Sequence, residues 1–271
     1  MSTALSSHAY RVMWWASLPL LPVLAVQGQR VRDTVSKLPE ADGPRQGRTE
    51  GAGGAELSVA VLGESTAAGV GAATQALGVA SSLANVLAER RGGPVGWQAV
   101  GQTGATVDRV QHELVSKLSW PIDVVVVMVG ANDTIRMTTE ARWAHSVLRL
   151  SEELRQRGAR SVVFAAVPPV GTFPALPRPL RDVLGVRAKL LDALLREVLL
   201  SADGVSYAQT EFPSGREYMA SDGVHPSELG YSEWARQLGQ HIVRLPLLRP
   251  AGPQAGFSTS DRFSSRDARP C

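Results

Sequence analysis

The segment IDVVVVMV, residues 122–129, is apolar and mostly β-branched after its acidic second position. It shows no alternation of apolar and polar residues, so it predicts a strand that is buried on both faces. Strands of this kind belong to parallel sheets, in which helices cover both sides. The segment therefore predicts an α/β domain, and the rest of the chain can be interpreted around it.

Strand-like and helix-like segments alternate on both sides of this run. The expected strands are residues 57–62, 95–100, 122–129, 161–167 and 205–209. The expected helices are residues 76–91, 107–118, 140–157, 183–200 and 227–244. Five successive β–α units predict a three-layer α/β/α fold around a five-stranded parallel sheet. Ligands of such sheets bind at the carboxyl ends of the strands, so functional residues are expected there.

The folded domain is expected to span residues 55–247, with different kinds of sequence on either side. Residues 1–54 contain an apolar segment followed by a flexible linker, because residues 40–56 are rich in glycine and charge and lack periodicity. Residues 248–271 are rich in small, polar and charged residues and predict a disordered tail.

The stretch VMWWASLPLLPVLAV, residues 12–26, is apolar and contains two adjacent tryptophans. It is shorter than the roughly 20 residues that a spanning helix needs, and its two prolines disfavour a regular helix. No good signal-peptide cleavage site follows it. We expect an uncleaved membrane anchor or interfacial segment, and the alternative is an N-terminal helix packed on the domain. More basic residues follow the stretch than precede it, which favours a cytoplasmic domain if the stretch spans a membrane.

The composition excludes several classes of function. The net charge is +3, and the basic residues are not gathered together with aromatic ones, so no nucleic-acid partner is expected. The only cysteine is Cys271, which rules out an intramolecular disulfide and a cysteine metal site within this chain. The histidines do not have the spacing of metal ligands, so we expect neither a metal nor a cofactor.

Ser65 follows the first expected strand, in the stretch VLGESTAAGVG of residues 61–71. Small residues surround it at a point where the chain must turn sharply. A serine in such a place is either a turn residue or helix N-cap, or a nucleophile held at the mouth of the sheet. Its position after a strand end makes it a candidate nucleophile.

His225 is the candidate base, because a serine hydroxyl is a weak nucleophile near neutral pH and needs a base beside it. A histidine in this role also needs its second ring nitrogen held, usually by a carboxylate. Asp222 stands three residues earlier in DGVHP, residues 222–226, on a turn that lets both side chains face one way. Taken singly, Asp222 could instead cap the next helix and His225 could be a surface residue.

Two other strand ends offer donors for a developing oxyanion. Gly104 lies in GQTGAT, residues 101–106, and Asn132 lies in GAND, residues 130–133. The backbone N–H groups of Ser65 and Gly104 and the side-chain amide of Asn132 could supply three donors. Each residue is also a common turn residue. The combination, in this order after successive strands, is what indicates a catalytic site.

These motifs together resemble those of the SGNH (GDSL-type) hydrolase family, whose letters stand for Ser, Gly, Asn and His. The matching positions are Ser65, Gly104, Asn132 and His225, with Asp222 completing a triad. The resemblance covers about residues 55–247 and implies a three-layer fold of flavodoxin-like strand order. It also implies hydrolysis of esters or thioesters through an acyl-enzyme, without a metal.

Glu64 departs from the family pattern, in which the first motif usually reads Gly-Asp-Ser. If this acid mainly braces the turn, glutamate can serve; if it needs a short hydrogen bond to the turn, the nucleophile would sit differently. We expect an effect on efficiency rather than on the class of reaction. Asp133 is expected only to brace its own loop.

The sequence therefore predicts a membrane-associated serine esterase or acylhydrolase acting on an apolar or lipid-like carboxylic ester. The proline-rich loop of residues 167–180 should border the site, and Phe173, Leu176 and Leu180 should either line an acyl or alcohol pocket or pack as ordinary loop residues. The alternatives are a carbohydrate acetylesterase or a thioesterase of the same fold. A non-catalytic binding module is disfavoured, because the serine, aspartate and histidine are all present.

Overall fold

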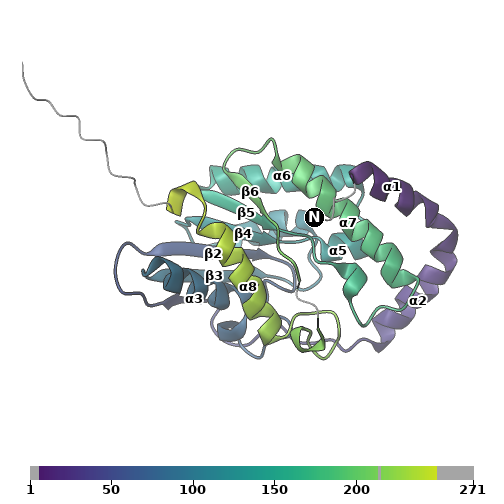
Figure 1. Ribbon diagram of the computed structural model, residues 1–271, viewed down its shortest axis with the longest axis horizontal. Helices are drawn as coiled ribbons and strands as arrows, with labels where there is room; N and C mark the ends of the chain where they lie inside the picture. The colour runs from purple at the N-terminus through teal and green to yellow at the C-terminus, as the bar shows by residue number, and fades with distance from the viewer. Residues whose placement is uncertain (1–5, 213–214, 249–271) are drawn as a thin grey trace, which may run out of the picture.

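The computed structural model describes residues 6–212 and 215–248, and a six-stranded sheet forms its centre (Figure 1). In spatial order the strands are β1 (Gln46–Thr49), β3 (Val95–Gly101), β2 (Leu57–Gly63), β4 (Val124–Met128), β5 (Ser161–Ala165) and β6 (Val205–Ala208). The five strands from β3 to β6 are parallel, in the order expected for a flavodoxin-like sheet. The predicted α/β architecture is confirmed.

The sixth strand, β1, corrects the expectation that residues 40–56 form a flexible linker. It pairs antiparallel with β3, with Gln46 opposite Gln98 and Thr49 opposite Val95. Its side chains are mostly exposed, so the sequence carries no alternation of apolar residues that would reveal it. Backbone hydrogen bonds to an existing sheet edge hold this segment, and local sequence patterns do not report such pairing.

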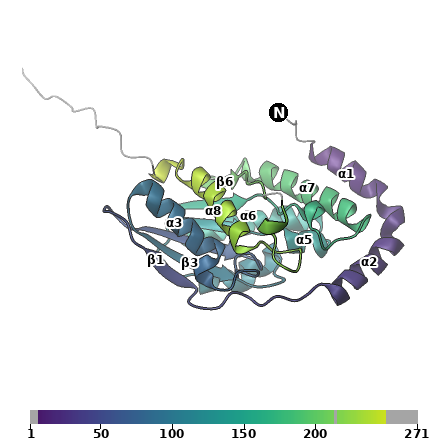
Figure 2. The same cartoon turned by 60° about the horizontal axis from the view of Figure 1, so that its bottom comes forward.

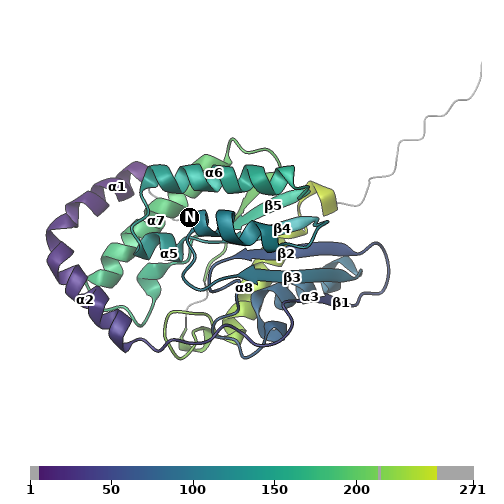
Figure 3. The ribbon, with the colours of Figure 1, turned by 180° about the vertical axis from the view of Figure 1, so that it is seen from behind.

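The sheet lies between two layers of helices (Figures 1 and 3). One layer consists of α3 (Val79–Arg91) and α8 (Glu228–Ile242), and the other contains α6 (Glu140–Gln156) and α7 (Leu180–Leu199). The expected helix at residues 107–118 is broken into α4 (Val107–Arg109), a π-helical turn (Val110–Leu114) and a 3-10 turn (Val115–Lys117). A short helix, α5 (Ala131–Ile135), follows β4 directly.

The apolar N-terminal stretch forms two helices, α1 (Ser7–Ala16) and α2 (Leu21–Thr34), joined by a 3-10 turn at Leu18–Leu20. They form an arc along the outer side of α7 (Figures 1 and 2). Of the residues that the structure describes, no single helix is long and apolar enough to cross a membrane. The two helices meet that requirement only as a pair bent by 41°. Residues 12–26 are therefore divided between two helices that lie against α7, rather than forming one continuous helix. The expectation that they form a membrane anchor or interfacial segment stays a prediction.

Polar contacts fix this helix pair to the domain. Arg11 on α1 donates two hydrogen bonds to Glu140 Oε2 at the start of α6, the shorter of them at 2.6 Å. Gln27 on α2 donates to the carbonyl of Arg178 at 2.8 Å and accepts the N–H of Leu180 at 3.0 Å. The Leu180 N–H belongs to the first turn of α7, where helical partners are missing. Gln27 therefore holds α2 against the beginning of α7.

The core consists of two clusters of buried apolar residues, one on each side of the sheet, and all five residues of β4 are buried, as its sequence predicts. The expected disordered tail, residues 248–271, lies outside the described residues from position 249 onward.

Candidate active site

Ser65 lies in a tight turn at the carboxyl end of β2, in the middle of the sheet. The N–H of Glu64 donates to the Met128 carbonyl at the end of β4, at 3.1 Å. The chain then turns back on itself, since the N–H of Ala68 donates to the Glu64 carbonyl and that of Val70 to the Ser65 carbonyl, at 3.1 and 3.0 Å. This turn holds the serine at the sheet edge where parallel sheets bind ligands.

The small residues after Ser65 are required by packing. Ala67 and Ala68 are buried against the end of β3. A Cβ atom added to Gly101 at that strand end would lie 2.3 Å from the Ala68 nitrogen, which no side chain tolerates. The turn and the neighbouring strand end are thus in direct backbone contact, and larger residues would push Ser65 away from the sheet.

His225 reaches Ser65 from a compact loop before α8. The N–H of Ala220 donates to the His225 carbonyl at 2.8 Å, and Gly223 turns the loop with a φ of 64°. Asp222 Oδ1 accepts the N–H groups of Val224 and His225, both at 3.0 Å. This loop therefore aims the Asp222 and His225 side chains at each other.

The three side chains form a continuous hydrogen-bonded chain. His225 Nε2 lies 2.9 Å from Ser65 Oγ, and His225 Nδ1 lies 2.5 Å from Asp222 Oδ2. A proton on Nδ1, shared with the carboxylate, leaves the Nε2 lone pair directed at the serine hydroxyl. Burial alone would raise the pKa of Asp222, but the hydrogen bonds from the His225 ring and from two backbone N–H groups hold it below its ordinary value. Asp222 is therefore ionised and can orient the imidazole.

The residues expected to supply the three donors surround one cavity of about 170 Å³ beside Ser65. Ser65, Gly104 and Asn132 all line it, together with His225. The N–H groups of Ser65 and Gly104 donate to no other residue within the described part of the chain. Gly104 has a φ of 78°, a backbone conformation that favours glycine. The structure brings together all five residues that the sequence motifs indicate.

Glu64 has a role that the sequence left open. Its carboxylate is buried and accepts the N–H groups of Ala131 and Asn132 at 3.1 and 3.0 Å. It also accepts the side-chain amide of Asn132 at 2.7 Å, which leaves the second hydrogen of that amide free for another acceptor. Burial raises the pKa of Glu64 to about 7, against the opposing effect of these hydrogen bonds. The acid before Ser65 therefore braces the loop after β4 and orients Asn132.

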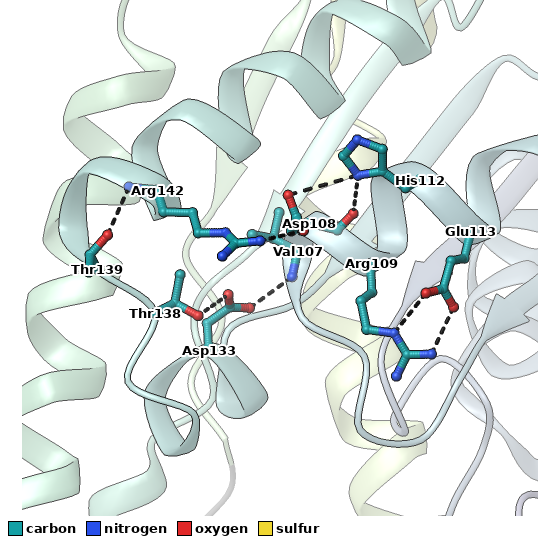
Figure 4. A network of polar contacts seen from close by, with 9 residues as sticks. All are labelled: Val107, Asp108, Arg109, His112, Glu113, Asp133, Thr138, Thr139 and Arg142. Atoms are coloured by element: carbon teal, nitrogen blue, oxygen red, sulfur yellow. Dashed lines mark hydrogen bonds and ion pairs between the residues drawn. The ribbon is translucent and has the colours of Figure 1, made fainter.

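Asp133 connects its own loop to the segment that begins at Val107 (Figure 4). Its carboxylate accepts the N–H of Val107 at 2.9 Å and the hydroxyl of Thr138 at 2.8 Å. The side chain is fully buried, and burial raises its pKa. The expected bracing role extends beyond its own loop, because Val107 starts the segment after β3.

Two residues that position His225, Gly71 and Tyr231, were not indicated by the sequence motifs. A Cβ atom on Gly71, whose φ is 101°, would lie 2.2 Å from the Pro226 carbonyl oxygen, so only glycine lets the two loops meet. The buried hydroxyl of Tyr231 on α8 donates to the Val70 carbonyl at 2.6 Å. The run of small residues ending at Gly71 was the available signal for this close approach.

The chain has recognisable relatives among known proteins. Residues 61–232, more than half of the chain, match the sequence profile of the GDSL-like lipase/acylhydrolase family. The chain belongs to this family. Its motifs stand at the expected places, with Glu64 in the position of the usual aspartate.

Individual proteins are also similar to this GDSL-like chain. A GDSL-like esterase of Mycobacterium tuberculosis is 29% identical over 185 residues, which cover 65% of this chain and 59% of that protein. The chain thus matches about three-fifths of the length of that relative. A lipase/acylhydrolase from Enterococcus faecalis has a similar fold, with a TM-score of 0.52, 22% identity and coverage of 69% of this chain and 95% of that one. The esterase EstA from Pseudoalteromonas gives a TM-score of 0.53 with 16% identity and coverage of 68% and 96%.

Proposed function

We propose that this GDSL-like chain is a serine hydrolase that cleaves carboxylic esters through an acyl-enzyme. The observation that carries the proposal is the continuous chain from Ser65 Oγ through the His225 ring to Asp222, with bonds of 2.9 and 2.5 Å. A serine, a base within hydrogen-bond reach and a group that orients the base are the elements that acyl transfer needs.

The first half-reaction forms the acyl-enzyme. Ser65 Oγ attacks the carbonyl carbon while its proton passes to His225 Nε2, and the carbonyl oxygen becomes an oxyanion. The N–H groups of Ser65 and Gly104 and the amide of Asn132 are the donors for this oxyanion. The bond to the alcohol oxygen then breaks, and that oxygen leaves with the proton from His225.

The second half-reaction uses water in place of the alcohol. His225 accepts a proton from the water, whose oxygen attacks the acyl carbon and again places charge on the oxyanion donors. The Ser65–acyl bond breaks, Ser65 regains its proton from His225 and the carboxylic acid is released. Asp222 stays ionised throughout and stabilises the imidazolium that forms twice in each cycle.

The test is the non-additivity of the triad. Ser65→Ala and His225→Ala should each remove nearly all hydrolysis of p-nitrophenyl esters, and the double variant should be scarcely worse than either, because the residues act as one unit. A fluorophosphonate should label Ser65 in the wild-type protein. Activity that survives Ser65→Ala, or labelling of another serine, would contradict the proposal. Acetyl-xylan and acyl-CoA in the same substrate panel separate ester hydrolysis from the sugar acetylesterase and thioesterase alternatives.

We also propose that the helix pair α1–α2 touches a lipid surface without crossing it. Several apolar side chains gather in exposed positions on this pair, and they include Val12, Met13, Trp15, Val23 and Val26. Tryptophan next to aliphatic residues is typical of helices that lie in a membrane interface. The protein would then be membrane-associated, as the sequence suggested, but through the outer face of folded helices.

Flotation with lipid vesicles tests this contact. The full chain should float with the vesicles. The variant Trp15→Ser/Val26→Ser should stay in the dense fraction without vesicles and should keep its hydrolytic rate on a water-soluble ester. Equal recovery of both proteins away from the vesicles would exclude the contact.

A further inference from the structure

A large apolar cavity lies between α2 and the segment that begins α7, and the catalytic steps above do not account for it. Its volume of about 730 Å³ falls in the range of pockets that hold whole small-molecule ligands. Its apolar walls come from both sides and include Leu21, Leu24, Gly28 and Val31 on α2 and Leu180 and Leu184 on α7. Most of the lining residues are apolar, with the basic Arg32 and Lys37 among the exceptions, so the cavity suits a hydrocarbon chain better than a sugar.

One stripe of α2 forms the outer wall of the cavity. Leu21, Leu24, Gly28 and Val31 follow one another at steps of three, four and three residues, which places them on one helical face. Val26 on the same helix lies outside the lining and is 66% exposed. Because Gln27 forms hydrogen bonds to the start of α7, this stripe is held at a fixed position across the cavity from α7.

The cavity opens onto the catalytic site. Four residues line both this cavity and the smaller one beside Ser65, namely Thr103, Ile135, Val224 and His225. Thr103 precedes Gly104, and Ile135 ends the helix that carries Asn132. A carbonyl group held by the donors of these two loops therefore stands at the junction. The chain attached to its carbon can pass directly into the apolar cavity.

We propose that this cavity binds the acyl chain of the substrate and that α2 determines the preferred chain length. The proposal rests on the ester hydrolysis proposed above and defines the substrate class as esters of medium- and long-chain fatty acids. The cavity beside Ser65 alone, at about 170 Å³, has room for little more than the reacting ester group. The helices α1 and α2 lie outside residues 61–232 that match the family, so this chain adds the wall of the acyl site from its own N-terminal segment.

Gly28 provides a clean test, because a Cβ atom added there would meet no atom within 4 Å. Phenylalanine at this position would fill part of the cavity without a backbone clash. Alanine would occupy almost none of it, and both residues are better helix formers than glycine. Val26→Phe places the same ring on the outer face of the same helix and serves as the matched control.

The measurement is kcat/KM for p-nitrophenyl acetate, butyrate, octanoate and laurate. In the wild-type protein each methylene that enters the cavity should raise kcat/KM by up to about fourfold. Gly28→Phe should lower kcat/KM for laurate by about tenfold or more and leave acetate within about twofold. Gly28→Ala and Val26→Phe should keep the wild-type profile. The free laurate anion should also inhibit hydrolysis of p-nitrophenyl acetate competitively, and its inhibition constant should rise in Gly28→Phe.

Three results would overturn the proposal. The first is a chain-length profile that Gly28→Phe leaves unchanged. If Gly28→Phe fails to fold, Ala25→Phe on the same cavity wall takes its place in this test. The second is an equal loss for acetate and laurate. The third is a loss that follows the alcohol in a series of alkyl acetates instead of the acid. In each of these cases the wild-type protein still shows Ser65-dependent hydrolysis, whereas failure of the proposed function would mean that the wild type hydrolyses no ester of the panel through Ser65.

Discussion

The residues of the proposed catalytic site are few, and each depends on one neighbour for its orientation. Ser65 depends on His225, which depends on Asp222, and Asn132 depends on Glu64 in the same way. Glutamate in place of the usual aspartate is compatible with the site because its carboxylate reaches both the backbone and the side chain of the loop after β4.

Asn132→Ala tests the oxyanion role of this side chain. Loss of one such donor typically lowers kcat by about 10²–10³. We expect a fall of that size, with KM nearly unchanged because the donor acts mainly in the transition state. Steady-state kinetics and a thermal melt measure the two effects separately. A variant that loses mainly thermal stability would show that Asn132 only shapes its turn.

Glu64 should make stability depend on pH near neutrality. Its pKa is about 7 in the folded protein, compared with 4.5 for an ordinary glutamate. Between these values the unfolded chain has lost a proton that the native state keeps, so the free energy of unfolding falls as the pH rises. Once the pH exceeds the folded-state pKa, this contribution no longer changes.

Urea denaturation at about pH 5 and pH 8 measures this effect in the wild type and in Glu64→Gln. These two pH values lie on either side of the folded-state pKa. The amide of the variant cannot titrate, so the stability advantage of the wild type over the variant should be larger at the lower pH. The same difference at both pH values would show that the Glu64 carboxyl titrates normally.

The loops that form the site follow four different strands. Buried polar contacts between the first residues of neighbouring helices hold these loops in fixed positions relative to one another. Asp133 at the start of α5 binds the N–H of Val107 at the start of α4 (Figure 4). The chain between Gly104 and Val107 is short, so this contact also sets the position of the Gly104 N–H.

Asp133→Ala should destabilise the protein more than the loss of a nearby surface acid does. The change leaves the buried N–H of Val107 without a partner, and a group of this kind typically costs about 1–3 kcal/mol. Asp108→Ala is the matched control, because Asp108 is partly exposed and pairs with the exposed Arg142 at 2.9 Å. Its loss should lower the free energy of unfolding by less than about 1 kcal/mol. Equal effects of the two variants in urea denaturation would contradict the bracing role of Asp133.

In the molecule as a whole, the N-terminal helices close one side of a domain that is otherwise built from the sheet and its two helical layers. Trp14 packs against the core, and the guanidinium of the buried Arg187 lies 4.8 Å from the centre of its ring. The bonds from Arg11 to Glu140 and from Gln27 to the start of α7 complete the attachment. These helices therefore belong to the folded unit.

A chain that begins at residue 37 should report on this attachment. Removing α1 and α2 uncovers apolar side chains such as Leu180 and Leu184, so the midpoint of thermal unfolding should fall. The triad and the sheet are retained, so hydrolysis of p-nitrophenyl acetate should persist. Calorimetry and kinetics of the shortened and full chains measure both effects. An unchanged unfolding midpoint would mean that the helices contribute nothing to the stability of the domain.

The amino-acid sequence was sufficient to predict the five parallel strands, the order of the β–α units and the five candidate site residues. Buried parallel strands such as residues 124–128 are apolar without interruption, so a local pattern reveals them. Chemistry at strand ends also needs particular residue types in a particular order, which the motifs around Ser65 and His225 supply.

Three other features became visible only in the folded chain. The edge strand β1 is held by backbone bonds to β3, which leave no pattern in its side chains. The contact of Glu64 with Asn132 joins residues 68 positions apart. The stripe of α2 carries the same apolar residues that a membrane segment would carry, so its sequence could not show that the stripe faces α7. Such contacts between distant segments depend on how the elements pack in three dimensions, and local periodicity carries no record of them.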